Sequence, residues 1–154
     1  MTITFIGGGN MASAIAGGLV ARGRPASGIA IVDPVDAQRA KLDAALPGVR
    51  THASVAAAAI AGSSIVVLAV KPQQMREVAR ALAPHLRGEL VLSIAAGIRS
   101  VDLARWLGDV LWVALGDPAS MLLGDWRAPS AEALELRARR GRKARKKWIE
   151  TTRL

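Results

Sequence analysis

Short apolar segments alternate with longer helix-like segments from residue 2 to residue 107 of this chain. The strand-like segments lie at 2–6, 29–32, 49–52, 65–70 and 90–94, and helix-like segments follow them at 10–22, 36–46, 54–61, 75–86 and 100–107. Strands and helices that alternate in this way form right-handed crossovers between parallel strands. The sequence therefore predicts an α/β fold with a doubly wound, mostly parallel sheet and helices on both faces.

The first strand-like segment leads directly into three consecutive glycines, and a helix-like segment follows them. Gly7, Gly9 and Ala12 fit the spacing G-x-G-x-x-G/A, which binds dinucleotides when it joins a strand to a helix. Gly7 permits the tight turn, Gly9 lets a pyrophosphate approach the backbone, and Ala12 keeps the helix close to the strand. Asn10 is the expected N-cap of the helix, whose first N–H groups face the phosphates. This pattern predicts a Rossmann-like dinucleotide-binding domain, with a purely structural turn as the alternative.

The adenosine ribose of such a cofactor is expected at the end of the second strand, where Asp33 lies 24 residues after Gly9. An acidic residue about 20 positions after the motif binds the ribose and repels a 2′-phosphate, which favours NAD. Arg39 lies six residues further on and is able to pair with that phosphate instead, so NAD and NADP both stay open. A different role for Asp33 is to end the strand together with Pro34 and to cap the next turn.

The ends of the fourth and fifth strands are expected at the nicotinamide ribose and ring. Residues 69–72 and 93–97 occupy these ends, and the small residues among them would let a flat ring lie against the backbone. For Lys71, a solvated position in a loop is as good an explanation as a contact with the cofactor. His52 and His85 are expected at surface or loop positions, and the sequence assigns no catalytic residue.

Composition excludes several kinds of site. The chain has no cysteine and two histidines, so it has no disulfide framework, thiolate zinc site or Cys nucleophile, and no metal ligand is assigned. The longest strongly apolar run, 65–70, is far shorter than the roughly 20 residues that cross a membrane, and no basic residue precedes Arg22. We therefore expect a cytoplasmic protein without a membrane partner.

The character of the chain changes after Gly108. Residues 1–126 carry 11 Lys and Arg against 9 Asp and Glu, whereas residues 127–154 carry 10 against 3. The sequence thus predicts a dinucleotide-binding domain over 1–108, a divergent segment with a candidate sixth strand at 110–115 over 109–130, and a basic tail, helical or disordered, over 131–154. The basic run within it, 137–147, has no interleaved aromatic residues, which disfavours nucleic acid as a partner.

Three motifs together resemble pyrroline-5-carboxylate reductases, which pass a hydride from NAD(P)H to a cyclic imine. The motifs read FIGGGNM at 5–11, LAVKPQ at 68–73 and LSIAAGI at 92–98. The resemblance extends from residue 1 to about residue 108. It implies binding of NADP or NAD by the following residues: Ile6, Gly7, Gly8, Gly9, Asn10 and Met11 at the pyrophosphate, Asp33 at the ribose, Ala69, Val70, Lys71 and Pro72 at the ribose and nicotinamide, and Ala95, Ala96 and Gly97 at the ring.

The chain departs from this family at two places. Ala56 stands where the family usually has an asparagine that contacts the cofactor, and the sequence around Gly116 lacks the Met-Pro-Asn-Thr-Pro-like turn that precedes the family's helical domain. That domain forms the dimer and supplies substrate contacts. The resemblance therefore implies a truncated reductase with little or no activity alone and without the family's oligomer. A nucleotide-binding regulatory domain and nucleic-acid binding through the basic tail are the alternatives.

Overall fold

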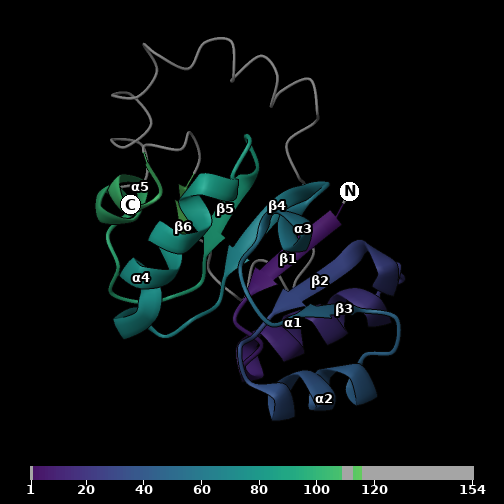
Figure 1. The fold of residues 1–154 in the computed structure, drawn as a ribbon. Helices are drawn as coiled ribbons and strands as arrows, with labels where there is room; N and C mark the ends of the chain where they lie inside the picture. The colour runs from purple at the N-terminus through teal and green to yellow at the C-terminus, as the bar shows by residue number, and fades with distance from the viewer. Residues whose placement is uncertain (1, 109–112, 116–154) are drawn as a thin grey trace.

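Six parallel strands form one sheet in the computed structural model, which describes residues 2–108 and 113–115 (Figure 1). The strands are β1 (Thr2–Ile6), β2 (Ile29–Val32), β3 (Arg50–His52), β4 (Ser63–Leu68), β5 (Leu90–Ser93) and β6 (Val113–Leu115). Their order is β3-β2-β1-β4-β5-β6, and each neighbouring pair is parallel. This order confirms the doubly wound, Rossmann-like fold class.

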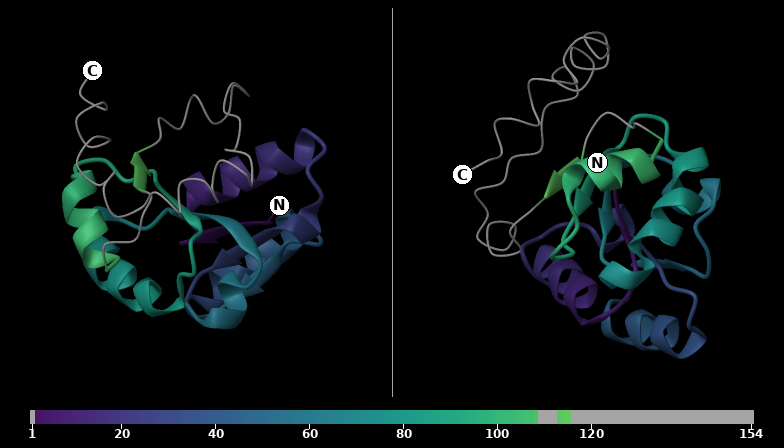
Figure 2. Two further views of the ribbon diagram at one scale, coloured as in Figure 1. Left: turned by 90° about the horizontal axis from the view of Figure 1, so that it is seen from above. Right: turned by 90° about the vertical axis from the view of Figure 1, so that its left-hand side faces the viewer.

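Helices cover both faces of the sheet (Figure 2). On one face lie α1 (Asn10–Ala21) and α2 (Asp36–Ala45), and on the other lie α3 (Ala57–Ile60), α4 (Pro72–Leu82) and α5 (Ser100–Trp106). Two short 3₁₀ turns, η1 (Ala26–Gly28) and η2 (Ala83–His85), complete the connections. In the part of the chain that the structure describes, no helix is long and apolar enough to span a bilayer.

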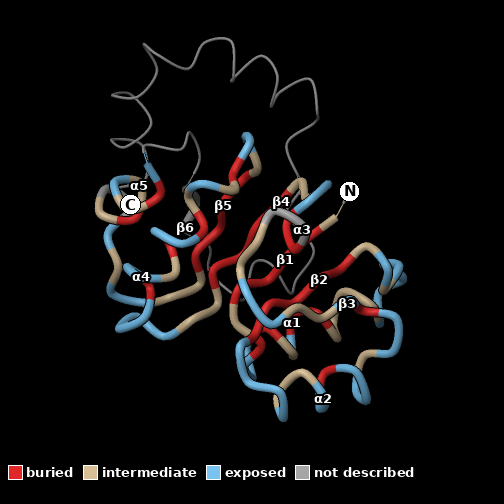
Figure 3. Tube along the Cα trace, viewed as in Figure 1, coloured by how far each residue is buried: buried red, intermediate tan, exposed pale blue. Residues whose placement is uncertain are grey.

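The core consists of two apolar layers separated by the sheet. Ile65 and Val67 of β4 pack toward α1 and α2, whereas Val66 and Leu68 pack toward α4 and α5. All four side chains are buried, which explains why this central strand reads as a continuous apolar run rather than an alternating one. Figure 3 shows the buried strands between helices whose outer surfaces are exposed.

Several observed element boundaries differ from the expected ones. Strand β4 ends at Leu68 instead of residue 70, because its partner β1 ends at Ile6 and the following residue, Gly7, turns away with a positive φ of 101°. Helix α4 begins at Pro72, which occupies the first helical turn where a missing N–H is tolerated. Helix α3 covers only Ala57–Ile60.

The three expected parts of the chain are described unequally. The structure describes all but the first residue of the part expected over 1–108, and β6 falls within the segment 110–115 that the sequence marks as a candidate strand. The rest of 109–130 and the basic segment 131–154 lie outside the described residues.

Candidate functional site

The carboxyl ends of β1, β4 and β5 meet at one edge of the sheet. Ile6, Leu68 and Ser93 occupy matching register positions on these neighbouring strands. The three sequence motifs therefore lie side by side, although 56 residues lie between the first and the second. The strand order also reverses between β1 and β4, and open α/β sheets bind ligands at this topological switch point.

Gly7 is required by the packing of the protein itself. Its N–H donates to the carbonyl of Val32 at 2.8 Å, which joins the loop to the end of β2. The φ of Gly7 is +101°, and a Cβ there would lie 2.8 Å from the carbonyl oxygen of Ala69 and 3.0 Å from Cγ1 of Val70. Only glycine fits here without strain, because the loop passes so close to the residues after β4 that a side chain would collide with them.

Two side chains from the β2–α2 region hold the Gly8 peptide. The carboxylate Oδ2 of Asp33 accepts a hydrogen bond from the Gly8 N–H at 2.8 Å, and Nε2 of Gln38 donates to the Gly8 carbonyl at 2.5 Å. Gly8 is buried, and a Cβ there would meet Cδ1 of Leu42 at 2.7 Å. The conformation of the glycine loop, Gly7–Gly9, is thus set by contacts with β2, α2 and β4.

Gly9 differs from the other two glycines because no atom of the described residues lies within 4 Å of a Cβ built on it. Gly9 is exposed and is the N-cap of α1, with φ −67° and ψ −174°. The expectation that Asn10 caps this helix is wrong, since Asn10 is already its first residue and no side chain caps the helix start. The first intrahelical bond runs from Ser13 N–H to the Gly9 carbonyl at 3.0 Å, so the N–H groups of residues 10–12 have no such partner. This end of α1 offers N–H groups and open space to an anion.

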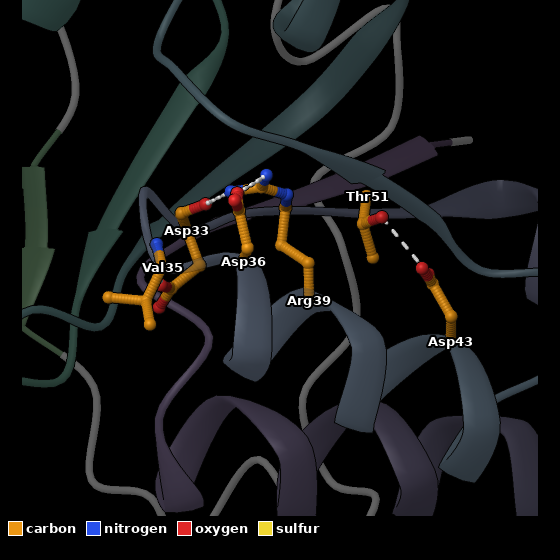
Figure 4. A network of polar contacts seen from close by, with 6 residues as sticks. All are labelled: Asp33, Val35, Asp36, Arg39, Asp43 and Thr51. Carbon is orange, nitrogen blue, oxygen red and sulfur yellow. Dashed lines mark hydrogen bonds and ion pairs between the residues drawn. The ribbon is translucent and has the colours of Figure 1, made fainter.

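Asp33 ends β2 and is 9% exposed. Its Oδ1 accepts a hydrogen bond from the N–H of Val35 at 2.9 Å, so the carboxylate caps the turn into α2 (Figure 4). The same carboxylate also holds Gly8. Nη1 of Arg39 donates to the Asp33 carbonyl at 2.7 Å, and Nη2 of Arg39 pairs with the carboxylate of Asp36. The turn-capping role of Asp33 is therefore present, and it places the carboxylate beside the glycine loop.

The other two strand ends present mostly small groups. Ala69 N–H donates to the carbonyl of Ile6 at 2.8 Å, and Val70 lies beside Gly7. Lys71 is exposed and is the N-cap of α4. After β5, Ala95 N–H bonds to Oγ of Ser93 at 3.3 Å, while Ala96 and Gly97 are exposed.

Sequence reasoning missed Gln38 as a contact of the glycine loop. Gln38 contacts Gly8 across 30 residues of chain, and its only local signal is a position in the first turn of the helix after Asp33. His52 is the last residue of β3, the strand expected over 49–52, and it is partly exposed, while its Nε2 is buried without a hydrogen-bond partner in the described part of the chain. His85 lies in the 3₁₀ turn η2 and is half-buried.

Comparison with known proteins agrees with this arrangement. A pyrroline-5-carboxylate reductase from Pseudomonas aeruginosa is 49% identical over 109 residues, which are 69% of this chain and 38% of that protein. A pyrroline-5-carboxylate reductase from Pisum sativum is 34% identical over 131 residues, 79% of this chain and 47% of that protein. The solved structure of a pyrroline-5-carboxylate reductase from Coxiella burnetii superposes with a TM-score of 0.65 at 35% identity, covering 70% of this chain and 40% of that one.

These relatives confirm the resemblance, and the chain spans less than half of the length of each. A family described as "NADP oxidoreductase coenzyme F420-dependent" matches residues 2–97. The matched segment contains β1 to β5, the glycine loop and all three strand ends described above. Because the match includes most of the chain and every element of the site, this protein belongs to the family of NADP oxidoreductases that carries that description.

Proposed function

We propose that the glycine loop binds the pyrophosphate of NADH or NADPH and that this chain is the cofactor-binding part of a pyrroline-5-carboxylate reductase-type enzyme. The observation that carries the proposal is the contrast among the three glycines. Packing explains the absence of a side chain at Gly7 and Gly8, whereas at Gly9 a side chain would enter only open space before the N-terminus of α1. A glycine at that position is explained by a ligand that approaches the backbone.

The residues at the site fit a dinucleotide. The first turn of α1 contains no acidic side chain that would repel a pyrophosphate, and Met11 is 47% exposed there. Ile6 and the loop residues through Met11 would hold the pyrophosphate, Asp33 the adenosine ribose, residues 69–72 the second ribose, and residues 95–97 the nicotinamide ring. Bound NAD(P)H would supply a hydride to the carbon of a C=N bond.

The protein's contribution to such a reaction is mainly positioning. Hydride transfer requires the imine carbon close to one face of the nicotinamide in a site from which water is excluded. The exposed small residues Ala96 and Gly97 leave room beside the strand ends for the nicotinamide ring. We assign no proton donor among the described residues. We also place this domain in the cytoplasm, with the dinucleotide and a small cyclic imine as ligands and without nucleic acid or membrane partners.

Cofactor binding is tested by titrating NADH and NADPH while nicotinamide fluorescence is measured. Gly9→Val is expected to raise the dissociation constants of both NADH and NADPH at least about tenfold, because the loss of one charge-assisted hydrogen bond to the pyrophosphate has that effect. Gly17→Ala is the control, since a Cβ at Gly17 makes only an ordinary 3.6 Å contact with Leu46, away from the loop. Equal binding by the wild-type protein and Gly9→Val would refute the proposal.

Catalysis is tested by NAD(P)H oxidation with 1-pyrroline-5-carboxylate, beside a full-length relative at the same concentration. We expect the isolated 154-residue chain to be at least about 100-fold slower, because good alignment contributes roughly 7–11 kcal/mol and half of that is two to four orders of magnitude. The similarity to the Pseudomonas enzyme covers only 38% of that protein. Turnover within about tenfold of the full-length relative would show that this chain builds a complete substrate site.

A further inference from the structure

Three ionic side chains at the connection between β2 and α2 are linked by hydrogen bonds: Asp33 follows β2, and Asp36 and Arg39 lie on α2. The carboxylate of Asp33 faces the glycine loop, and its two oxygens accept hydrogen bonds from the N–H groups of Gly8 and Val35. Each carboxylate oxygen has a second lone pair, so Asp33 keeps capacity for the hydroxyl groups of a ribose. Its position beside the loop makes it a negative group at the adenosine end of the proposed cofactor.

Arg39 is the basic side chain at this place, and it already has partners. One guanidinium nitrogen donates to the Asp33 carbonyl at 2.7 Å and another pairs with the Asp36 carboxylate, so Arg39 contacts both aspartates (Figure 4). The Arg39 side chain is 19% exposed, whereas that of Asp36 is 92% exposed. The positive charge is thus partly buried, and its carboxylate partner lies on the solvent side.

From these contacts we infer that the β2 end selects NAD(H) over NADP(H), and that Asp36 is the residue that determines this selection. The inference rests on the proposed function. At this edge the carboxylates of Asp33 and Asp36 provide two negative charges, and the guanidinium of Arg39 provides one positive charge. A 2′-phosphate adds further negative charge, and it would pair with Arg39 only by displacing the carboxylate of Asp36. The carboxylate of Asp33 is held by the N–H groups of Gly8 and Val35, so it does not compete with a phosphate for Arg39.

The chain offers a matched control for Asp36. Asp36 and Asp43 both lie on α2, both are exposed, and either one loses the same charge when it becomes asparagine. Asp43 accepts a hydrogen bond from Thr51 at 3.0 Å, and no contact in the described residues joins it to Arg39. A comparison of Asp36→Asn with Asp43→Asn therefore separates the pairing with Arg39 from a general change in net charge.

The experiment measures dissociation constants for NADH and NADPH, and for the fragments 5′-AMP and adenosine 2′,5′-bisphosphate, by isothermal titration calorimetry. The wild-type protein is expected to bind NADH at least about tenfold more tightly than NADPH. Asp36→Asn should reduce this ratio at least about fivefold, with a parallel gain for the bisphosphate over 5′-AMP, and Asp43→Asn should change it less than about twofold. Adding Arg39→Gln to Asp36→Asn should remove the gain.

Each result has a defined consequence. Preference of the wild-type protein for NADPH, or equal changes in Asp36→Asn and Asp43→Asn, would overturn the inference while leaving dinucleotide binding intact. Absence of binding of all four nucleotides to the folded wild-type protein would instead overturn the proposed function. Circular dichroism of each variant confirms folding, and the exposed position of Asp36 makes a folding defect in Asp36→Asn unexpected.

Discussion

Replacing Gly7 with alanine should destabilise the ligand-free protein strongly, because two independent penalties coincide at this residue. A φ of +101° is strained for a residue with a side chain, at about 1–3 kcal/mol. The new Cβ would also lie 2.8 Å from the backbone oxygen of Ala69, and forced displacement of a well-packed neighbour costs typically 1–3 kcal/mol. Together we expect a loss of about 2–6 kcal/mol, against a total stability of about 5–15 kcal/mol for an ordinary domain.

Two other glycines separate these penalties. Gly23 has a φ of +89°, and within the described part of the chain no atom lies within 4 Å of a built Cβ, so Gly23→Ala should show the backbone strain alone, about 1–3 kcal/mol. Gly9 has a φ of −67° and open space, so Gly9→Ala should lose about 1 kcal/mol or less, the usual difference between glycine and alanine at an N-cap. The expected order of destabilisation is therefore Gly7, then Gly23, then Gly9.

Urea unfolding followed by far-ultraviolet circular dichroism measures this order, provided that the dependence of the unfolding free energy on urea concentration stays the same among the variants. The same proteins are then titrated with NADH. Gly23→Ala should bind NADH like the wild-type protein, since Gly23 lies at the far end of α1 from the loop. If Gly7→Ala proved no less stable than Gly23→Ala, the close passage between the loop and Ala69 would be refuted.

Two further predictions concern buried and exposed carboxylates. Asp33→Asn should lose about 1–3 kcal/mol of stability, because one of the N–H groups of Gly8 and Val35 would face an amide N–H₂ instead of an acceptor; unchanged urea unfolding would contradict this. The hydrogen bond from Arg99, at 2.7 Å, holds the pKa of Asp102 below its usual value, so the carboxylate stabilises the fold at neutral pH and this contribution is lost as the pH falls through the lowered pKa. The stability difference between the wild-type protein and Asp102→Asn should therefore be constant near pH 7 and shrink below about pH 4, and a difference that grew on acidification would reverse the sign of this argument.

Local patterns in the sequence were sufficient for the fold class and for the edge of the sheet that carries the site. An apolar run bounded by glycine or proline predicts a strand because side-chain burial and backbone preference act within a few residues. The glycine spacing at 7–9, followed by a helix-like segment, likewise indicated the loop and its location. That the fourth and fifth strands present their carboxyl ends at this edge followed from the general rule for parallel strands, although both strands end one or two residues earlier than expected.

The tertiary structure decided which atoms meet at that edge. That Asp33 and Gln38 both hold the Gly8 peptide, 25 and 30 residues away, depends on the crossover that places β2 beside β1. The distinction between two glycines required by packing and one that faces open space also depends on this placement. Sequence patterns report preferences over a few neighbouring residues, whereas these contacts join segments that only the folded sheet brings within hydrogen-bond distance.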